Sequence, residues 1–432
     1  MNKLIILLIA FFFINNCSFN EDSKLWQDKE KELVSKPNIK KVFSKEKKII
    51  SEFNQDLKLD ISFDKTNNKV FNNKNNFGFQ NFDGVLNKNS NFKFSKFKDL
   101  NQIDFNPIIL KEAVIFFDNK GSIIKYDKNQ KIVWKRNYYT KLEKKLQPRL
   151  DFTLNKDNLI VTDNISKYYS FNVNSGKLNW SNNNSYPFNS EIKKYKNKFF
   201  VIDYKNTLRC YNIIDGSECW SVQTEDTFTV SSSKYSLIIF NNMVVFNNST
   251  GDITAVDIDT GLITWLLPTQ GGNIKSEAFN FKFSKLVLDN NSIFFSNNKS
   301  EFYSIDVKTG TINWIAEINS NITPIIAGDI IFTVSDEGFL YTVEKNQGNI
   351  IKITDLYKNY KEKERNKLYP VGFAIGNKNL YLTNSNGRII VVDLSSGDIL
   401  KEQKVSGNLI SKPLIFNNSL YLIRNGSIDK YN

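Results

Sequence analysis

The chain has 432 residues, 41% of them hydrophobic and 14% aromatic, which is enough to bury a large core. After the N-terminus, no stretch of the sequence is apolar enough to cross a bilayer. The formal net charge of +13 comes with 52 lysines and only 6 arginines, scattered among asparagines. Nucleic-acid recognition favours the forked guanidinium group on one basic face, so we expect no nucleic-acid partner.

The N-terminus has the pattern of a secreted, lipid-anchored protein. Lys3 is followed by the apolar run Leu4–Ile14, which is too short to span a bilayer and is typical of a signal peptide. The run leads to Cys17, and this arrangement resembles the lipobox of bacterial lipoproteins. It predicts a signal peptide over residues 1–16 and lipidation of Cys17, while Ser18 resembles an outer-membrane sorting signal. Ordinary secretion with an incidental cysteine is the alternative.

The segment after the signal peptide lacks the apolar pattern of a folded domain. Residues 17–55 are polar and dense in lysine, with several glutamates. Such a composition does not bury enough apolar surface to fold by itself. We interpret this segment as a tether between the lipid anchor and the folded domain.

The rest of the chain repeats one short phrase about every 45 residues, which is the signature of a repeat architecture. The clearest copy runs from Gly251 to Trp265. Two later copies keep the turn glycine, Gly348 and Gly397, but not the tryptophan, and an eighth copy begins at Gly426. Five copies end in a tryptophan four residues after a glycine or glutamine: Trp134, Trp180, Trp220, Trp265 and Trp314.

Each copy predicts a strand, a tight turn and a second strand. Apolar residues alternate before a Thr-Gly or Ser-Gly pair and again after it. Glycine takes the positive φ of such a turn, and an aspartate such as Asp257 bonds nearby backbone amides. An upstream run such as Lys285–Phe295 supplies two more strands. The repeat therefore predicts an all-β fold, an eight-bladed β-propeller of four-stranded antiparallel blades over residues 56–432.

The truncated eighth copy requires a strand from elsewhere to close the ring. The run Asp56–Phe63 alternates polar and apolar residues and is not used by any copy. It is our candidate for the strand that pairs with Ile428. Closure of this kind removes the exposed sheet edges that favour aggregation.

Two cysteines, Cys210 and Cys219, flank the turn of the third copy. In an oxidising compartment they could form a disulfide across the hairpin. A pair of free thiols, with Cys210 filling a small-residue position of the repeat, fits the sequence equally well.

The sequence lacks the residues of most catalytic sites. It has no histidine, which removes the commonest general base and metal ligand. It also has no phosphate-binding loop and no CxxC pair. The recurring aspartates are more typical of turn caps than of catalysis. We therefore expect a binding protein without catalytic residues, cofactor or metal.

The repeat resembles the tryptophan-docking motif of quinoprotein propellers, which is matched here by Ala255, Asp257, Thr260, Gly261 and Trp265. The resemblance implies that each indole stacks between blades. The enzymes of that group bind pyrroloquinoline quinone with calcium and usually have adjacent cysteines beside the cofactor. This chain has no adjacent cysteines, and the motif without that machinery favours a scaffold.

The lipobox, the tether and the eight copies together resemble the BamB family of outer-membrane assembly lipoproteins, from Cys17 to Asn432. That resemblance implies a non-catalytic scaffold, anchored by lipid at the periplasmic face of the outer membrane. It also implies binding to the POTRA domains of a BamA-like insertase and contact with other assembly lipoproteins. Nascent outer-membrane proteins are the implied client.

The resemblance also places a partner-binding patch in two connecting segments. They correspond here to residues 225–230, where Phe228 and Val230 supply apolar contacts, and to residues 272–281, where Glu277 supplies an acid. The alternative is that Phe228 and Val230 belong to the inner strand of the fourth blade.

Two other classes of function remain open on the sequence. One is a periplasmic enzyme with a quinone or sugar-derived ligand in the channel of the propeller. The other is a cell-surface propeller for adhesion or polysaccharide handling.

Overall fold

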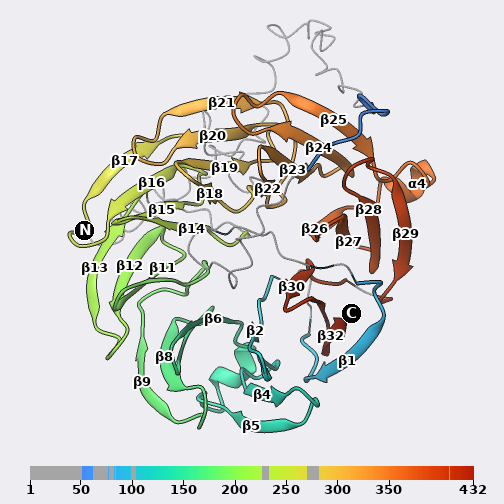
Figure 1. The fold of residues 1–432 in the computed structure, drawn as a ribbon. Coiled ribbons are helices and arrows are strands. Elements are labelled where there is room, and N and C mark those ends of the chain that lie inside the picture. The colour runs from blue at the N-terminus through green and yellow to red at the C-terminus, as the bar shows by residue number, and fades with distance from the viewer. Residues whose placement is uncertain are drawn as a thin grey trace, which may run out of the picture. The chain divides into compact units, whose positions relative to one another are not determined.

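The folded part of the chain is a ring of β-sheets. The computed structural model describes residues 51–61, 76, 82, 84–98, 104–225, 233–269, 282–407 and 409–432. Residues 51–432 form one compact unit. The described residues form eight four-stranded antiparallel sheets around a centre (Figure 1), so the predicted eight-bladed propeller is confirmed.

Seven blades are built from four consecutive strands each, and blades are numbered here in chain order. Blade 1 contains β2 (Ile108–Ile109), β3 (Ala113–Phe117), β4 (Ile123–Asp127) and β5 (Ile132–Arg136). Blade 2 contains β6 (Leu150–Asn155), β7 (Asn158–Asp163), β8 (Lys167–Asn172) and β9 (Leu178–Asn183). Blade 3 contains β10 (Lys193–Tyr195), β11 (Lys198–Ile202), β12 (Thr207–Asn212) and β13 (Glu218–Gln223). The first strand of each blade lies nearest the centre and the fourth lies outermost (Figure 1).

The same order continues through the second half of the ring. Blade 4 contains β14 (Leu237–Phe240), β15 (Met243–Asn247), β16 (Ile253–Asp257) and β17 (Ile263–Leu267). Blade 5 contains β18 (Val287–Asp289), β19 (Ser292–Ser296), β20 (Phe302–Asp306) and β21 (Ile312–Ala316). Blade 6 contains β22 (Ile325–Ala327), β23 (Ile330–Val334), β24 (Phe339–Glu344) and β25 (Ile350–Asp355). Blade 7 contains β26 (Pro370–Ile375), β27 (Asn379–Asn384), β28 (Arg388–Asp393) and β29 (Ile399–Lys404). Short helical turns, η3 (Glu143–Leu146) and α4 (Glu362–Arg365), connect blade 1 to blade 2 and blade 6 to blade 7.

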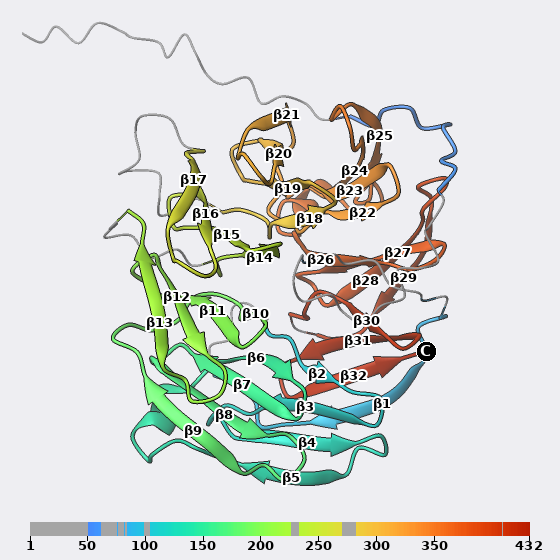
Figure 2. The same ribbon diagram turned by 60° about the vertical axis from the view of Figure 1, so that its left-hand side comes forward.

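Blade 8 closes the ring with a strand from the N-terminal side of the chain. It contains β30 (Leu414–Phe416), β31 (Ser419–Arg424) and β32 (Ser427–Tyr431), and its outer strand is β1 (Lys88–Lys93). β1 lies beside β32 (Figure 2). The two strands are antiparallel, with Phe92 opposite Ile428. The sequence-based choice of Asp56–Phe63 as the closing strand was therefore wrong. The alternation in that run has another use, described below.

The core lies between neighbouring blades. The inner and middle strands are buried on both faces; all five residues of β3 are buried, whereas β9 and β13 alternate between exposed and half-buried positions. Separate apolar clusters fill the spaces between blades 2 and 3, 3 and 4, 4 and 5, 6 and 7, and 7 and 8. A larger cluster joins blades 8, 1 and 2. Each blade is thus stabilised mainly by its two neighbours.

The outer hairpin of blade 4 shows how the repeated turn forms. The Oδ1 atom of Asp257 accepts hydrogen bonds from the backbone N–H groups of Asp259 and Thr260 at 3.0 and 2.8 Å. The N–H of Gly261, which has φ +74°, donates to the backbone carbonyl of Asp257. These bonds are those expected of an aspartate that caps a turn, and they lower the pKa of Asp257.

The five repeat tryptophans join each of blades 1 to 5 to the blade that follows. Every indole N–H donates to a backbone carbonyl in the outer turn of the next blade, at 2.9 to 3.2 Å. The ring of Trp314 also lies against the turn glycine of blade 6, because a Cβ atom on Gly348 would lie 2.5 Å from the ring. The glycine is therefore needed for close approach of the indole as well as for its φ of +77°.

The joint between blades 6 and 7 has no tryptophan and is built differently. Lys352 stands opposite Thr342, in the register that Trp314 has opposite Ser304. Its ammonium group donates to the backbone carbonyls of Ser396, in the outer turn of blade 7, and of Gln55 and Leu57, each at 2.7 Å. The last two carbonyls belong to the segment Ser51–Ile61, which we call the strap.

The strap is bound to both blades along its length. Phe53 exchanges two backbone hydrogen bonds of 3.1 Å with Ile353 of β25, and the N–H of Leu59 donates to the carbonyl of Ser395 in blade 7. Leu59 and Ile61 pack against the apolar cluster between blades 6 and 7. The alternation seen in the sequence therefore places apolar side chains on the outside of this joint.

Candidate functional site in the central channel

One position of the repeat brings polar side chains to the centre of the ring. In six blades this position lies five residues before a residue of positive φ, which forms the turn between the first and the second strand of the blade. Six of these central residues come from blades 2, 3, 4, 5, 6 and 8: Asp151, Glu191, Ser236, Lys285, Thr323 and Lys412. They were not predicted from the sequence, although a polar or charged residue five positions before each of these turns is a signal that could have revealed them.

Glu191 forms two ion pairs, one within blade 3 and one that crosses the channel. Its Oε1 atom lies 3.2 Å from Nζ of Lys193, and its Oε2 atom lies 3.2 Å from Nζ of Lys285. Because blades 3 and 5 are not neighbours in the ring, the second ion pair runs through the centre. Burial by itself would raise the pKa of Glu191, but the lysines outweigh it and lower this pKa to about 2.

Lys193 is fully buried, and its environment favours the neutral form of its side chain. Burial lowers the pKa of this lysine to about 8, and attraction to Glu191 offsets the effect only in part. Its ammonium group also donates to Oδ1 of Asn76. Asn76 in turn donates to the backbone carbonyls of Leu237 and Leu286, at 3.2 and 2.9 Å. A residue from before the first blade thus links blades 3, 4 and 5 inside the channel.

Another ion pair joins blade 2 to blade 4. Nζ of Lys234 lies 2.7 and 2.8 Å from the two carboxylate oxygens of Asp151, and it donates to the backbone carbonyl of Asp104 at 3.0 Å. The same ammonium group lies 5.6 Å from the ring centre of Phe105, which is within cation–π range. Burial raises the pKa of Asp151 despite this partner.

Lys412 adds a positive charge from blade 8. Burial, followed by repulsion from Lys285, lowers its pKa to about 8, while Asp104 and Glu191 act in the opposite direction. We call the residues that meet here the channel charge cluster; its members are Asp104, Asp151, Glu191, Lys193, Lys234, Lys285 and Lys412.

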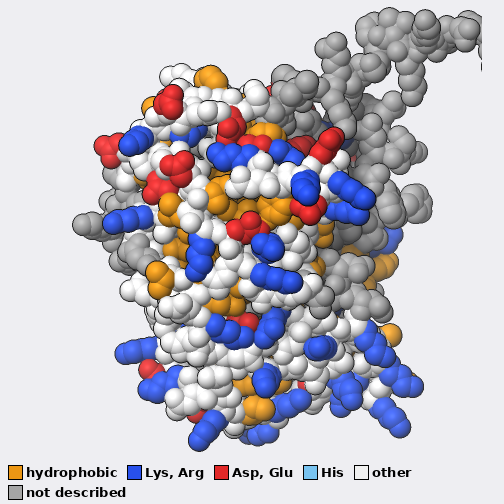
Figure 3. Space-filling model, turned by 90° about the vertical axis from the view of Figure 1, so that its right-hand side faces the viewer, with side chains coloured by type: hydrophobic (Ala, Val, Ile, Leu, Met, Phe, Trp, Pro, Cys, Tyr) orange, Lys and Arg blue, Asp and Glu red, His pale blue; other side chains and the backbone are white. Residues whose placement is uncertain are grey.

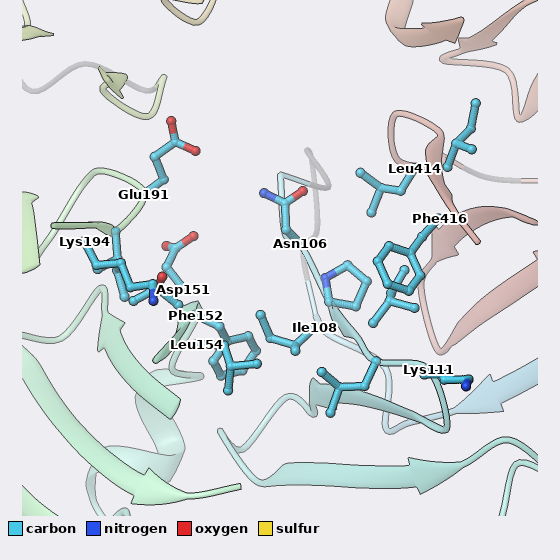
Figure 4. A pocket seen from close by; sticks show the side chains of 16 residues that line it. Asn106, Ile108, Lys111, Asp151, Phe152, Leu154, Glu191, Lys194, Leu414 and Phe416 are labelled. Carbon is cyan, nitrogen blue, oxygen red and sulfur yellow. The ribbon is translucent and has the colours of Figure 1, made fainter. Parts of the chain in front are cut away.

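A cavity of about 540 Å³ opens beside this cluster, between the inner strands of blades 8, 1, 2 and 3. Figure 4 shows Glu191 and Asp151 on one side of it and Leu414 and Phe416 on the other. Ile108 and further apolar side chains from β2 and β6 complete the wall. The cavity has the size and the largely apolar lining of a small-molecule pocket.

Several residues singled out from the sequence lie outside the described residues. These are the lipidation candidate and the three partner-binding candidates, Cys17, Phe228, Val230 and Glu277. The two segments that contain the partner-binding candidates follow β13 and β17, the outer strands of neighbouring blades.

The two cysteines of blade 3 are free thiols in the structure. Cys210 is buried in β12 opposite Trp220, and Cys219 is the extra residue of a bulge in β13, where it is exposed. Burial, together with the neighbouring Cys219, raises the pKa of the Cys210 thiol. The disulfide that the sequence left open is not formed here, although the two residues are adjacent.

Other features of the surface and composition give less specific information. Among the described residues there is no group of three or more side chains suited to hold a metal ion, and no helix in that part of the chain is long and apolar enough to cross a membrane. On the face shown in Figure 3, lysine and arginine side chains are spread over the surface instead of being gathered in one stripe.

Comparisons with known proteins give a family model and several similar folds. The model of outer membrane protein assembly factor BamB matches residues 119–354, which is more than half of the chain. A comparison with curated proteins found no match. Among solved structures, BamB from Moraxella catarrhalis has a TM-score of 0.64 and 16% identity, over 81% of this chain and 100% of that one.

Propeller enzymes have similar folds. A europium-containing methanol dehydrogenase has a TM-score of 0.61 at 10% identity, over 80% of this chain and 87% of that one. The quinohemoprotein alcohol dehydrogenase from Comamonas testosteroni has a TM-score of 0.58 at 10% identity, over 82% and 78% of the two chains. At such identities these likenesses concern the fold alone.

Proposed function

Because the chain belongs to the family of outer membrane protein assembly factor BamB, we propose that it is a non-catalytic scaffold of outer-membrane protein assembly. Its role is to bind the POTRA domains of a BamA-like insertase and to help nascent outer-membrane proteins fold and insert. The observation that carries this proposal is the family match over residues 119–354. The eight-bladed ring, with its tryptophan joints, supplies a rigid body suited to binding.

In this proposal the protein is held at the periplasmic face of the outer membrane. Residues 1–16 are the signal peptide and Cys17 carries the lipid. The tether, predicted over residues 17–55, is proposed to end at residue 50, because Phe53 of the strap is hydrogen-bonded to Ile353 of blade 6. Mass spectrometry of the N-terminal peptide of membrane-purified protein would detect the lipid on Cys17.

The partner-binding patch is proposed on the segments that contain Phe228, Val230 and Glu277. They follow β13 and β17, which are equivalent strands of neighbouring blades, so the C-terminal ends of these two strands lie on the same face of the ring. Leu266 on β17 of blade 4 is 50% exposed, and Ile315 on β21 of blade 5 is 53% exposed.

Binding to purified POTRA domains tests the scaffold role. We expect a complex at micromolar concentration, and we expect Phe228→Asp to weaken it about tenfold or more, as loss of an apolar anchor does. Leu400→Asp is the matched control, because Leu400 is 57% exposed on the outer strand of blade 7. No complex with the unchanged chain would count against the proposal, and equal weakening by both variants would move the patch elsewhere.

The non-catalytic part of the proposal has a separate test. Most charged side chains of the channel charge cluster are engaged with one another, as in the pairs Glu191–Lys285 and Asp151–Lys234. We expect native mass spectrometry and an absorbance scan of protein isolated from its own cells to show no quinone. A stoichiometric quinone would contradict the scaffold role and favour an enzyme.

A further inference from the structure

The connection between blades 1 and 2 carries exposed leucines beside lysines. It contains the short turn η3, in which no residue is buried. Leu142 and Leu146, at the two ends of this turn, are 74% and 63% exposed. Lys141, Lys144 and Lys145 lie next to them in the sequence. Neither leucine packs into an apolar cluster of the described residues, so the connection exposes apolar surface that the ring does not use.

Two further lysines lie beside this connection. The backbone N–H of Lys98, which follows β1, donates to Oε1 of Gln147 at 3.2 Å. The backbone carbonyl of Lys120, in the turn between β3 and β4, accepts a hydrogen bond of 2.9 Å from Asn137. We call this group the basic surface; its members are Lys98, Lys120, Lys141, Lys144, Lys145, Leu142 and Leu146. All of them are exposed except Lys144, which is half-buried.

The carboxylates near the basic surface already have other partners. Oε1 of Glu143 lies 3.3 Å from Nζ of Lys167, and its Oε2 accepts a hydrogen bond of 2.6 Å from the backbone N–H of Thr140. Asp118 is buried, and its Oδ2 lies 2.7 Å from Nζ of Lys135. Within the part of the chain that the structure describes, the five lysines of the basic surface form no ion pair. The surface therefore has an excess of positive charge.

We propose that the basic surface binds an anionic lipid membrane, with Leu142 and Leu146 inserted among the headgroups and the lysine ammonium groups on the lipid phosphates. Exposed leucines flanked by lysines are typical of segments that lie in a membrane interface. Lysine suits this position because its stem covers apolar surface while its ammonium group stays in water. An acidic protein is a less suitable partner, because lysine is depleted at protein interfaces and leucine is under-represented among the residues that dominate their affinity.

The equivalent connection between blades 6 and 7 has a different chemistry. Its short helix α4 contains two glutamates and two basic residues, and Leu368 beyond the helix is buried. Because β5 and β25 are equivalent outer strands, their C-terminal ends lie on the same face of the ring. The exposed leucines and the excess charge are therefore properties of the basic surface and not of every connection on this face, which makes the α4 connection an internal control.

Co-sedimentation with lipid vesicles tests the proposal. The protein is the full chain with Cys17→Ser, so that binding requires neither a lipid anchor nor the scaffold role. We expect vesicles with about 30% phosphatidylglycerol to bind at least about tenfold more strongly than vesicles of phosphatidylcholine alone, because several lysines act together at an anionic surface. Salt at about 0.5 M should remove most of this preference by screening.

Charge reversal shows where the membrane binds. Lys141→Glu combined with Lys145→Glu should weaken binding to the anionic vesicles at least about tenfold. The matched control is Lys361→Glu combined with Lys363→Glu, which makes the same change of net charge at two exposed lysines of the α4 connection. We expect the control to weaken binding less than about threefold, because its charges lie farther from the membrane.

The leucines give a second readout, which is independent of charge. Leu142→Gln should weaken binding to the anionic vesicles about fivefold, because less apolar surface leaves water on insertion. Leu400→Gln is the matched control, since Leu400 is 57% exposed on the outer strand of blade 7, and it should leave binding unchanged.

Three results would overturn the proposal, with near-ultraviolet circular dichroism used to show that each protein is folded. The first is no binding to the anionic vesicles, which would favour an acidic protein as the partner of the basic surface. The second is equal binding to the two kinds of vesicle, which would mean adsorption through apolar segments alone. The third is equal weakening by the two charge-reversal pairs, which would mean a general attraction of a basic protein.

Discussion

The joints after blades 1 to 5 and the joint after blade 6 achieve the same contact with different residues. At the first five, one indole supplies both a hydrogen-bond donor and an apolar surface against the next turn, as Trp314 does at Gly348. At the sixth, Lys352 supplies only the donor, and the strap supplies two acceptors and the apolar side chains of Leu59 and Ile61. The tryptophan joint is local in the repeat, whereas the lysine joint depends on a segment almost 300 residues away.

The joint between blades 7 and 8 extends this comparison. Lys401 stands at the tryptophan position there and is exposed. Phe82 and Leu86, from the chain that leads into β1, pack between the two blades, and Leu86 accepts a hydrogen bond from Gln403. The joints between blades 6 and 7 and between blades 7 and 8 are therefore both covered by segments that precede the first blade in the sequence.

The largest effect is expected at a tryptophan joint. Trp314→Ala removes the indole from its contacts with Phe294, Phe302 and Gly348 and deletes its hydrogen bond to Lys345. We expect a loss of about 3 kcal/mol or more in the free energy of unfolding, as for other large-to-small core substitutions. Urea denaturation measures it.

The control for this experiment is the one tryptophan outside the repeat. Trp26 lies outside the described residues, in the predicted tether. Trp26→Ala should change the free energy of unfolding by less than about 0.5 kcal/mol. Equal losses at Trp26 and Trp314 would contradict the role given to the repeat tryptophans.

The lysine joint should show a smaller effect. Lys352→Met leaves the carbonyls of Gln55, Leu57 and Ser396 without their common donor, and we expect a loss of about 2 kcal/mol. Lys401→Met is the matched change at the next copy, where the side chain is exposed, and should cost less than about 0.5 kcal/mol. If the two variants had the same stability, Lys352 would not be a joint residue.

Coupling between the strap and Lys352 is expected to be smaller still. Leu59→Ala removes half-buried apolar surface at the same joint and should cost about 1 kcal/mol. Combined with Lys352→Met, the two losses should fall short of additivity by about 0.5 to 1 kcal/mol, because both variants loosen the strap. Leu59→Ala with Lys401→Met should be additive, and additivity in both pairs would mean that strap and lysine act independently.

The smallest effect is expected from modification of the cysteines in blade 3. Reaction of a thiol reagent with the exposed cysteine should leave the tryptophan joint of this blade intact. In the folded, non-reduced protein we expect the exposed Cys219 to react with a thiol reagent and the buried Cys210 to react only after unfolding. Absence of any reactive thiol from this pair, even after unfolding without reductant, would show that the disulfide forms in solution.

The repeat made most of the fold predictable, because its signals are local. The glycine in the outer turn, the aspartate that caps this turn, and the alternation on either side predicted the strands and the number of blades. The strap was assigned the wrong partner, since its alternation shows that one side is buried but does not say against which sheet. β1, which closes the ring, has no repeat phrase to mark it.

The central site was less predictable than the blades. A single lysine or glutamate such as Lys412 or Glu191 looks like an ordinary surface residue in the sequence. Its meaning depends on which other blades face it across the ring, and the ion pair between Glu191 and Lys285 joins residues from two different repeats. No local pattern contains that information.

The sequence by itself determined the propeller and its family, through a phrase that each blade repeats within about 45 residues. Only the tertiary structure decided which segment closes the ring, how the joints without tryptophan are held, and which charges meet in the channel. The physical reason is the range of the interactions. Turns and strands form from neighbouring residues, whereas the contacts of Lys352 and the channel charge cluster exist only once the ring has closed.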